Sequence, residues 1–531
     1  MELPRLIEAL SNPSAFGDPS AGPIEVHQTH ISVVFLAGDF AYKIKKPVAL
    51  DFLDYSTLER RRHFCEEEVR LNRRLAPDVY LGVVPIARHG NELRIEGPGE
   101  PVEWSVKMRR LPNSAMLRDQ LARGNVDAGV LDGLARRLAR FHRSADSGPA
   151  IAACCSFETV AANARENFLQ AASHVGITLS RSTLNRLRDR TELALAEQRA
   201  TIEARAARGV ARDTHGDLRL DHVYWFPDRP APGDWIAVDC IEFNPRYRHA
   251  DPIADIAFLA MELALAGRPD LARAFVSSYL READDADGNA LLPFYRSYRA
   301  AVRGKVEGMK LDEPEIPEDE RASARRRARA LWLHALGELE SPGRRPCLVL
   351  LAGLPGTGKS TLARGLAERA GFSVIRSDEV RKQLAGRDRA PAGFGEDIYT
   401  PEWNDRTYGE CLSRAESIVF DAGRVLIDAS FRDESRRRVF LDAARCWGVA
   451  GRLLICRADP EVVRGRLAGR RDDASDADWS IYREALQHWD EPGPVTRAAS
   501  DTIDANGTPQ RSLEQAVDFL RAAGLLDSSP S

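Results

Sequence analysis

The sequence predicts two domains, an α+β domain over residues 1–340 and an α/β domain with a parallel sheet over residues 346–525. Three observations support this division. A chain of 531 residues is long enough for two to four domains. Strand and helix patterns are mixed in the first part, whereas they alternate regularly in the last part. The hexapeptide SPGRRP, residues 341–346, has the composition of a linker between them.

The first domain begins with extended segments and one helix. Residues 30–46 (HISVVFLAGDFAYKIKK) predict two strands around the turn Ala37-Gly38-Asp39. Residues 56–76 predict a helix with Ser56 as its N-cap, and residues 102–111 predict another strand. From residue 115 to 340 the pattern is mainly helical, with an extended interruption over residues 210–243. The first domain is therefore expected to be α+β.

In the second domain, apolar runs alternate with helical patterns. The predicted strands are CLVLLA (347–352), FSVIRS (372–377), RVLIDAS (424–430) and GRLLICRA (451–458). Short apolar strands separated by helices are typical of βαβ units, whose strands run parallel. A parallel α/β sheet is the expected result.

Composition excludes several classes of protein. The net charge is −4, so no global attraction to nucleic acid or membrane is expected. No apolar run reaches the length of a membrane span, and the first 20 residues lack the pattern of a signal peptide. The eight cysteines are scattered without metal-site spacing. These features predict a cytoplasmic protein with reduced thiols, no membrane contact and no obligate protein partner.

Residues 353–360, GLPGTGKS, form the most informative motif. They follow a predicted strand and precede a predicted helix, which is the context of a phosphate-binding P-loop. Backbone N–H groups of such a loop surround phosphate oxygens, the lysine contacts the outer phosphates, and the hydroxyl holds Mg²⁺. The motif predicts binding of ATP, or of another nucleoside triphosphate, with Mg²⁺. The predicted nucleotide-binding residues are Gly353, Pro355, Gly356, Thr357, Gly358, Lys359, Ser360 and Thr361.

Further polar residues follow the P-loop. Asp378 comes after the second predicted strand and is the expected base for an attacking hydroxyl, with Arg381 as a contact for an anionic acceptor. Asp428 ends the third strand and is a predicted Mg²⁺ ligand together with Ser360, although a strand-end aspartate can also be a turn residue.

A basic pair lies further along the chain. Arg466 and Arg470 share one face of a helix predicted to begin at Asp459-Pro460. They are predicted to clamp the transferred phosphate, or else to form a solvated face.

The first domain contains a second candidate phosphate site. Only eight of the 75 basic residues are lysines, and Lys43 is one of them. Phosphoryl transfer in kinase-like folds needs a strand lysine, a catalytic aspartate and a metal-binding aspartate. Lys43, Asp217 and Asp239 occur in that order. His222 is a further predicted metal ligand, and Glu67 or Glu68 is expected to pair with the lysine.

The first 340 residues resemble the aminoglycoside phosphotransferase-like family of small-molecule kinases. The resemblance rests on THISVVFL, AYKIKKP, FLDYSTLERRRHFCEEEVRLN, HGDLRLDHVYW and VDCIEFNPRYRHADPIADIAFLAMEL. It implies a protein-kinase-like fold, with Asp217 as catalytic aspartate and Asp239 as metal ligand. The strand lysine falls on Lys43, with Lys45 as the alternative on the same face of the strand.

Two further aspartates agree with this family, and one residue differs from it. Asp251 and Asp255 match structural positions of the family. His222 stands where the family has asparagine, and Mg²⁺ prefers oxygen ligands to imidazole nitrogen.

The C-terminal part resembles P-loop kinases such as polynucleotide 5′-hydroxyl kinases, zeta-toxin-like kinases and gluconate kinases. The resemblance rests on GLPGTGKS and on the SDEVR stretch. The whole chain resembles bacterial fusions of the two kinase types.

Three functional hypotheses follow. In the main one, both domains transfer the γ-phosphoryl group of ATP to hydroxyl acceptors, such as a sugar-like molecule or a nucleic acid end. In the second, only the C-terminal domain is catalytic, and the N-terminal domain is a binding or regulatory module. In the third, the protein is a nucleotide-gated regulator.

Overall fold

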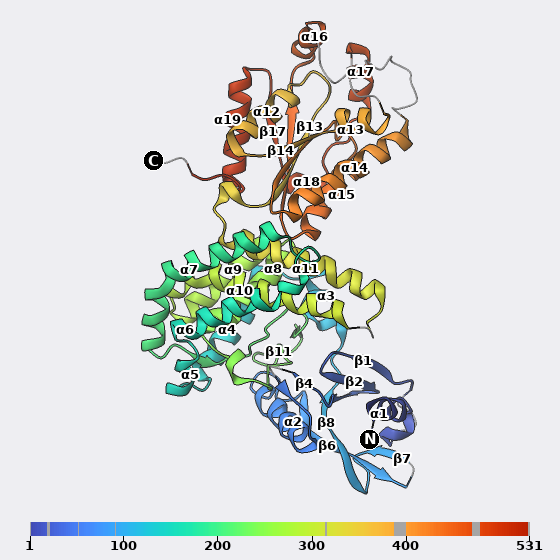
Figure 1. Cartoon of the computed structure of the whole chain (residues 1–531), viewed down its shortest axis with the longest axis vertical. Coiled ribbons are helices and arrows are strands. Elements are labelled where there is room, and N and C mark those ends of the chain that lie inside the picture. The colour runs from blue at the N-terminus through green and yellow to red at the C-terminus, as the bar shows by residue number, and fades with distance from the viewer. Residues whose placement is uncertain are drawn as a thin grey trace. The chain divides into compact units, whose positions relative to one another are not determined.

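The computed structural model describes residues 2–17, 22–50, 53–90, 92–313, 316–386, 400–469 and 478–528. The chain forms two compact units, shown in Figure 1. Unit 1 comprises Met1–Ala161 and Gln198–Tyr295, and unit 2 comprises Ala162–Glu197 and Arg296–Ser531. The helices α6 (Phe157–Gln170), α7 (Arg181–Ala207) and α10 (Leu292–Met309) each contribute residues to both. No described helix combines the length and the apolar character needed to cross a membrane.

Unit 1 contains an antiparallel sheet with the strand order β1-β2-β3-β8-β6-β7. Its strands are β1 (Glu25–Gln28), β2 (Ser32–Ala37), β3 (Phe40–Lys45), β6 (Tyr80–His89), β7 (Glu92–Ile95) and β8 (Glu100–Arg109). The predicted hairpin is confirmed, since β2 and β3 pair around the turn with Ala37 opposite Phe40. Val33, Phe35 and Ile44 are buried on one face of the sheet with α1 (Leu3–Leu10). The alternate residues Lys43 and Lys45 therefore face the other side.

Helix α2 (Leu58–Asn72) packs on the face that carries the lysines. Its N-cap is Thr57, whose hydroxyl accepts a hydrogen bond from the N–H of Arg60 at 3.3 Å. The prediction of Ser56 is wrong by one residue, because the Ser56 hydroxyl instead donates to Asp54 at 2.6 Å.

The rest of unit 1 is mainly helical, as expected, with short strands in the predicted interruption. The helices are α3 (Leu117–Ala122), α4 (Ala128–Ser144), α5 (Pro149–Ala153), α8 (Pro252–Leu265) and α9 (Pro269–Ala283). The short strands are β4 (Ala49–Leu50), β5 (Leu53–Asp54), β9 (Arg212–Asp213), β10 (Val223–Trp225), β11 (Trp235–Ala237) and β12 (His249–Ala250). Helix α8 is apolar on most of its surface and is almost wholly buried, as such helices are in protein cores.

Unit 2 contains the predicted parallel sheet, with the strand order β14-β15-β13-β16-β17. Its strands are β13 (Cys347–Ala352), β14 (Ser373–Arg376), β15 (Arg424–Asp428), β16 (Ala450–Arg457) and β17 (Ser500–Asp504). The first four match the predicted strands. The edge strand β17 was not predicted, because its sequence SDTID is polar and has only one buried residue, Ile503.

Helices cover both faces of this sheet. Cys347, Val349 and Leu351 of β13 pack with α12 (Lys359–Ala370) and α19 (Pro509–Ala522), while α14 and α15 contact β13 as well. The remaining helices of unit 2 are α11 (Glu318–Leu339), α13 (Ser377–Leu384), α14 (Pro401–Phe420), α15 (Glu434–Cys446), α16 (Pro460–Ala468), α17 (Trp479–Gln487) and α18 (Pro494–Ala498). The carboxyl ends of the strands thus meet at one edge, where parallel α/β sheets bind ligands.

Candidate functional site

In unit 1, the loop His215-Gly216-Asp217 is held by the first turn of α8. Asp255 accepts hydrogen bonds from the N–H groups of His215 at 3.1 Å and Gly216 at 2.8 Å. Gly216 has φ 84°, and a Cβ there would lie 3.1 Å from the Tyr247 carbonyl oxygen, so glycine suits the turn. Asp255 therefore fixes the loop that carries Asp217.

Asp213 anchors the strand that leads into this loop. Its carboxylate accepts a hydrogen bond from Arg248 at 2.8 Å and forms an ion pair with Arg74 at 3.3 Å. Burial acts to raise the pKa of Asp213, but the hydrogen bond from His249 and the charges of Arg248 and Arg74 outweigh it and lower the pKa to about 2. The folded state therefore favours the ionised carboxylate.

This pKa predicts an acid-dependent loss of stability. Because an unfolded aspartate takes up its proton near pH 4, the contribution of Asp213 is complete above that pH and is lost as the pH falls toward 2. We expect the contribution to be about 2 kcal/mol. Urea unfolding of wild type and Asp213→Asn between pH 6 and pH 3 should show a stability difference that shrinks with acidification, with the exposed Asp228→Asn as control. A difference that stays constant over this range would contradict the prediction.

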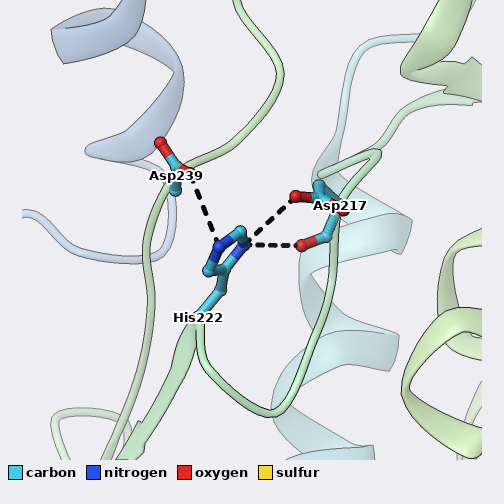
Figure 2. A group of neighbouring side chains, drawn as sticks. All are labelled: Asp217, His222 and Asp239. Carbon is cyan, nitrogen blue, oxygen red and sulfur yellow. Dashed lines mark hydrogen bonds and ion pairs between the residues drawn. The ribbon is translucent and has the colours of Figure 1, made fainter. Parts of the chain in front are cut away.

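Figure 2 shows the imidazole of His222 between the carboxylates of Asp217 and Asp239. The His222 Nδ1 atom lies 2.9 Å from the Asp217 carbonyl oxygen and 3.5 Å from its Oδ2. The Nε2 atom lies 3.5 Å from Asp239 Oδ2. One possible ligand atom from each residue lies within 4.8 Å of the other two, so the structure brings the predicted metal ligands together.

A network of charged side chains, buried at Glu68, Lys45 and Glu242 and partly exposed at Asp239, completes this site. Lys43 Nζ donates to Glu68 at 2.9 Å and to Asp239 at 2.6 Å. Lys45 Nζ donates to the other oxygen of Glu68 at 2.8 Å and to Glu242, which also accepts from the hydroxyl of Tyr55. Of the two lysines, only Lys43 reaches Asp239. Of the two predicted glutamates, Glu68 contacts both lysines, whereas Glu67 pairs with Arg70 instead.

The network also sets the protonation states. Burial disfavours the charge of Lys43, but Asp239 and Glu68 outweigh this and raise the pKa of Lys43 well above its ordinary value. Burial also disfavours the carboxylate of Asp239, but Lys43 and His222 lower the pKa of Asp239 well below its ordinary value. Both groups are therefore charged near neutral pH, as binding of phosphate and metal requires.

The backbone at Asp239 is unusual. Asp239 has φ 63°, a left-handed conformation that is uncommon for residues other than glycine. Its N–H donates to the Tyr80 hydroxyl at 3.1 Å, and the next N–H, of Cys240, donates to Asn72 at 2.9 Å. Strand β6 and helix α2 thus hold the turn that directs Asp239 to Lys43.

In unit 2, the residues of GLPGTGKS join β13 to α12. Gly353, Gly356 and Gly358 all have positive φ, and α12 begins at Lys359. A Cβ at Gly353 would lie 2.6 Å from the carbonyl oxygen of Cys456, and one at Gly356 would lie 2.8 Å from Val463. The loop therefore has the strained, glycine-dependent path that places backbone N–H groups around phosphate.

Gly353→Ala is expected to destabilise unit 2 by about 1–3 kcal/mol, because the new methyl group meets a backbone oxygen at a residue of φ 147°. Gly337→Ala is the matched control. Gly337 lies in helix α11, where a Cβ has open space, so alanine should stabilise slightly. Calorimetric unfolding of both variants measures the effects, and equal unfolding temperatures would contradict the expectation.

The strand ends bring polar side chains to the loop. In the sheet register, Asp428 of β15 is opposite both Leu351 of β13 and Arg376 of β14. The Ser360 hydroxyl donates to Asp428 at 2.8 Å, and Arg376 donates to the Ser360 oxygen at 3.3 Å. Lys359 Nζ donates to the Leu354 carbonyl at 2.9 Å, across the loop. The hydroxyl and carboxylate oxygens of Ser360 and Asp428 suit Mg²⁺, which prefers oxygen ligands.

The other predicted loop residues differ in environment. Thr357 is buried and its hydroxyl donates to the Leu354 carbonyl at 2.8 Å, so it braces the loop. Thr361 is exposed and Pro355 is partly buried.

Asp378 lies in the first turn of α13. Strand β14 pairs with β15, and β15 pairs with the P-loop strand β13. Asp378 therefore follows a strand that is separated from β13 by one other strand. Burial, and then the charge of Asp428, raise the pKa of Asp378 above its ordinary value. A carboxylate with a raised pKa is a suitable proton acceptor for a hydroxyl. Arg381 is buried and donates to Asn404 at 2.9 Å.

Of the predicted arginine pair, only Arg466 is described. It donates to the Ala505 carbonyl at 2.8 Å, and its NH1 atom would lie 3.7 Å from a Cβ at Gly358. Arg466 is therefore next to the P-loop. Arg470 lies outside the described residues.

Three charged residues of these sites were not predicted from the sequence, namely Glu242, Arg219 and Arg376. Arg219 lies two residues after Asp217 and donates to its carboxylate at 3.1 Å. Arg376 is the last residue but one of the predicted strand FSVIRS, which was the available signal for it. Glu242 follows Asp239 by three residues, but its contact with Lys45 depends on the fold.

A match to a family model concerns the second unit. Residues 348–492 match the model described as an AAA domain. With the glycine loop and the parallel sheet, this match identifies a P-loop domain.

Some solved structures resemble about a third of this chain. A gluconokinase from Sinorhizobium meliloti 1021 is 17% identical, covers 34% of this chain and 95% of its own, and has a TM-score of 0.27. The tunicamycin resistance protein of Deinococcus radiodurans is 22% identical, covers 35% of this chain and 100% of its own, and has a TM-score of 0.25. Chaetomium thermophilum Kti12, solved with ADP-AlF3, is 19% identical, covers 33% of this chain and 98% of its own, and has a TM-score of 0.26.

Relatives in mycobacteria match nearly the whole chain. The "Uncharacterized protein Rv2004c" of Mycobacterium tuberculosis and the "Uncharacterized protein Mb2027c" of Mycobacterium bovis are each 32% identical over 510 residues. The match covers 94% of this chain and 96% of each relative, so it extends across both units. The chain belongs to the family of these two mycobacterial proteins.

Proposed function

We propose that this protein is an ATP-dependent phosphotransferase with two kinase-type domains, residues 1–340 and 346–525. Each domain transfers a γ-phosphoryl group to a hydroxyl acceptor, such as a sugar-like molecule or a nucleic acid end. The reaction takes place in the cytoplasm and requires Mg²⁺ in the C-terminal domain.

In the C-terminal domain, the P-loop N–H groups and Lys359 bind the phosphates, and Ser360 and Asp428 hold Mg²⁺. The ion neutralises charge on the transferred group when it is bound. Asp378 accepts the proton of the acceptor hydroxyl, and Arg466, close to Gly358 of the loop, stabilises the transferred phosphate. Arg381, buried close to Asp378, provides a positive charge for an anionic acceptor.

In the N-terminal domain, Lys43 binds the phosphates, Glu68 orients Lys43, and Asp217 is the base. The observation that carries this assignment is the position of Lys43. It bridges Glu68 and Asp239, two carboxylates that are 171 positions apart in the chain. His222 in turn connects Asp239 to Asp217.

A second candidate function for the N-terminal domain is binding without transfer. It is favoured by His222, which supplies nitrogen where a Mg²⁺ site normally has oxygen. In this alternative, the domain positions nucleotide or acceptor for the P-loop domain, which alone is catalytic.

The test is a screen of hydroxyl compounds and of RNA and DNA ends with ATP labelled in the γ-phosphate. Wild type, Lys359→Ala and Asp217→Asn are compared, with the exposed substitutions Arg364→Ala and Asp228→Asn as controls. We expect each active-site variant to abolish labelling of its own class of acceptor. If Asp217→Asn changes neither labelling nor ATP consumption, the N-terminal domain is a binding module. If wild type labels no acceptor, the phosphotransferase proposal fails.

A further inference from the structure

The side chain of Arg219 contacts two members of the Asp217–His222–Asp239 cluster. Its Nε atom donates to Asp217 Oδ2 at 3.1 Å, and its NH2 atom lies 2.6 Å from His222 Nε2. The Arg219 side chain is 15% exposed, so solvent screens its charge only in part. Asp239 and Glu262 also interact electrostatically with it.

This contact determines which nitrogen of His222 carries the proton. A guanidinium can only donate hydrogen bonds, so Nε2 must be the acceptor. The proton of the neutral ring is then on Nδ1, which donates to the Asp217 carbonyl oxygen at 2.9 Å. A backbone carbonyl that receives the other N–H is the usual partner of a metal-binding histidine.

The Nε2 atom of His222 lies 3.5 Å from the Oδ2 atom of Asp239, and Figure 2 shows this edge of the ring next to that carboxylate. Each of these two acceptors has a cation beside it: Arg219 lies against Nε2, and Lys43 Nζ donates to Asp239 Oδ1 at 2.6 Å. A divalent ion would lie about 2.0–2.2 Å from a ligating nitrogen or oxygen, which conflicts with a guanidinium nitrogen 2.6 Å from Nε2. The guanidinium and an ion are therefore alternatives.

The ligand set also bears on which ion would enter. One imidazole nitrogen and two carboxylates fit Mg²⁺ poorly, because this ion prefers oxygen in a near-octahedral shell. A nitrogen ligand suits first-row transition ions such as Mn²⁺ better.

We propose that Arg219 is a resident cation of the N-terminal site, and that a divalent ion binds to Asp217, His222 and Asp239 only by displacing it. The inference rests on the proposed N-terminal phosphate site and adds a way in which metal binding at that site is regulated. With Arg219 in place, its guanidinium is the cation beside Asp217 and His222; with Arg219 displaced, the three residues form a transition-ion site that prefers Mn²⁺ to Mg²⁺.

The test measures Mn²⁺ binding to the full chain without nucleotide, by the electron paramagnetic resonance signal of free Mn²⁺. All proteins carry Asp428→Asn, which weakens the candidate ion site of the P-loop domain. We expect Arg219→Gln to bind one Mn²⁺ at least about tenfold more tightly than the parent, whereas Arg219→Lys keeps a cation in place and binds like the parent. Adding Asp239→Asn to Arg219→Gln should abolish the gain, which locates the ion.

Competition with Mg²⁺ tests the selectivity. Mg²⁺ in about tenfold excess should leave most Mn²⁺ bound to Arg219→Gln, and His222→Asn in that background should remove this preference. Equal Mn²⁺ affinity of parent and Arg219→Gln, or no added Mn²⁺ site in Arg219→Gln, would overturn the proposal. A calorimetric transition matching that of the parent confirms that each variant is folded. If Arg219→Gln does not fold, Arg219→Met replaces it in the same measurements. The Mn²⁺ measurement needs no phosphoryl transfer. The proposal for Arg219 can therefore be tested even if the acceptor screen finds no labelled compound.

Discussion

Lys359→Ala is expected to reduce phosphoryl transfer by the P-loop domain by about 10²–10³-fold. The Lys359 ammonium lies across the loop, 2.9 Å from the Leu354 carbonyl, at the first residue of α12. Phosphate oxygens carry negative charge, so they are stronger partners for the ammonium than the carbonyl is. The ammonium also stabilises the negative charge on the γ-phosphoryl group during transfer. Removing the ammonium leaves this charge without its main protein cation.

The measurement is the rate of γ-phosphoryl release or transfer at saturating ATP. Arg364→Ala is the matched control, because it removes an exposed cation from the same helix. Lys359→Arg should also be impaired, since a planar guanidinium does not replace a compact ammonium. A Lys359→Ala rate within threefold of the control would show that the loop does not act on phosphate in this way.

Glu68→Ala is expected to lower the free energy of unfolding of unit 1 by about 3–5 kcal/mol. Glu68 is fully buried, and its two oxygens accept from Lys43 and Lys45. Its removal leaves the two lysines, one of them 1% exposed, with one carboxylate partner fewer each. Breaking a buried ion pair by removing one partner is costly, because the remaining charge is desolvated.

The neighbouring residue offers a close control. Glu67 pairs with Arg70 on the surface of the same helix, and such pairs contribute at most about 1 kcal/mol. Differential scanning calorimetry should therefore show a large fall in the unfolding temperature for Glu68→Ala and a small one for Glu67→Ala. Similar temperatures for the two variants would mean that the buried network is not a source of stability.

Local patterns were sufficient to predict the strands and loops that carry the two sites. Alternating side chains placed Lys43 and Lys45 on one face of β3, and the strand–loop–helix order identified the P-loop. The N-cap of α2 was misplaced by one residue, since Ser56 and Thr57 both offer a hydroxyl and only the backbone path selects between them. Strand β17 is an edge strand that buries a single side chain, so its apolar signal is weak.

The rest of the site depends on contacts between distant segments. Lys45 meets Glu242 from 197 positions away, and no spacing in the sequence indicates that pair. Arg219 is close to Asp217 in the chain, but its contact with His222 results from the turn of the loop. Such residues become identifiable only when the fold brings their charges together.

The central claim is that this chain has two separate phosphate sites. Isothermal titration with a non-hydrolysable ATP analogue and Mg²⁺ tests it most directly, because it requires no acceptor. We predict two molecules bound per chain in wild type, one in Lys359→Ala, one in Lys43→Met and none in the double variant. One molecule per chain in wild type, lost completely in Lys359→Ala and unaffected in Lys43→Met, would contradict the claim.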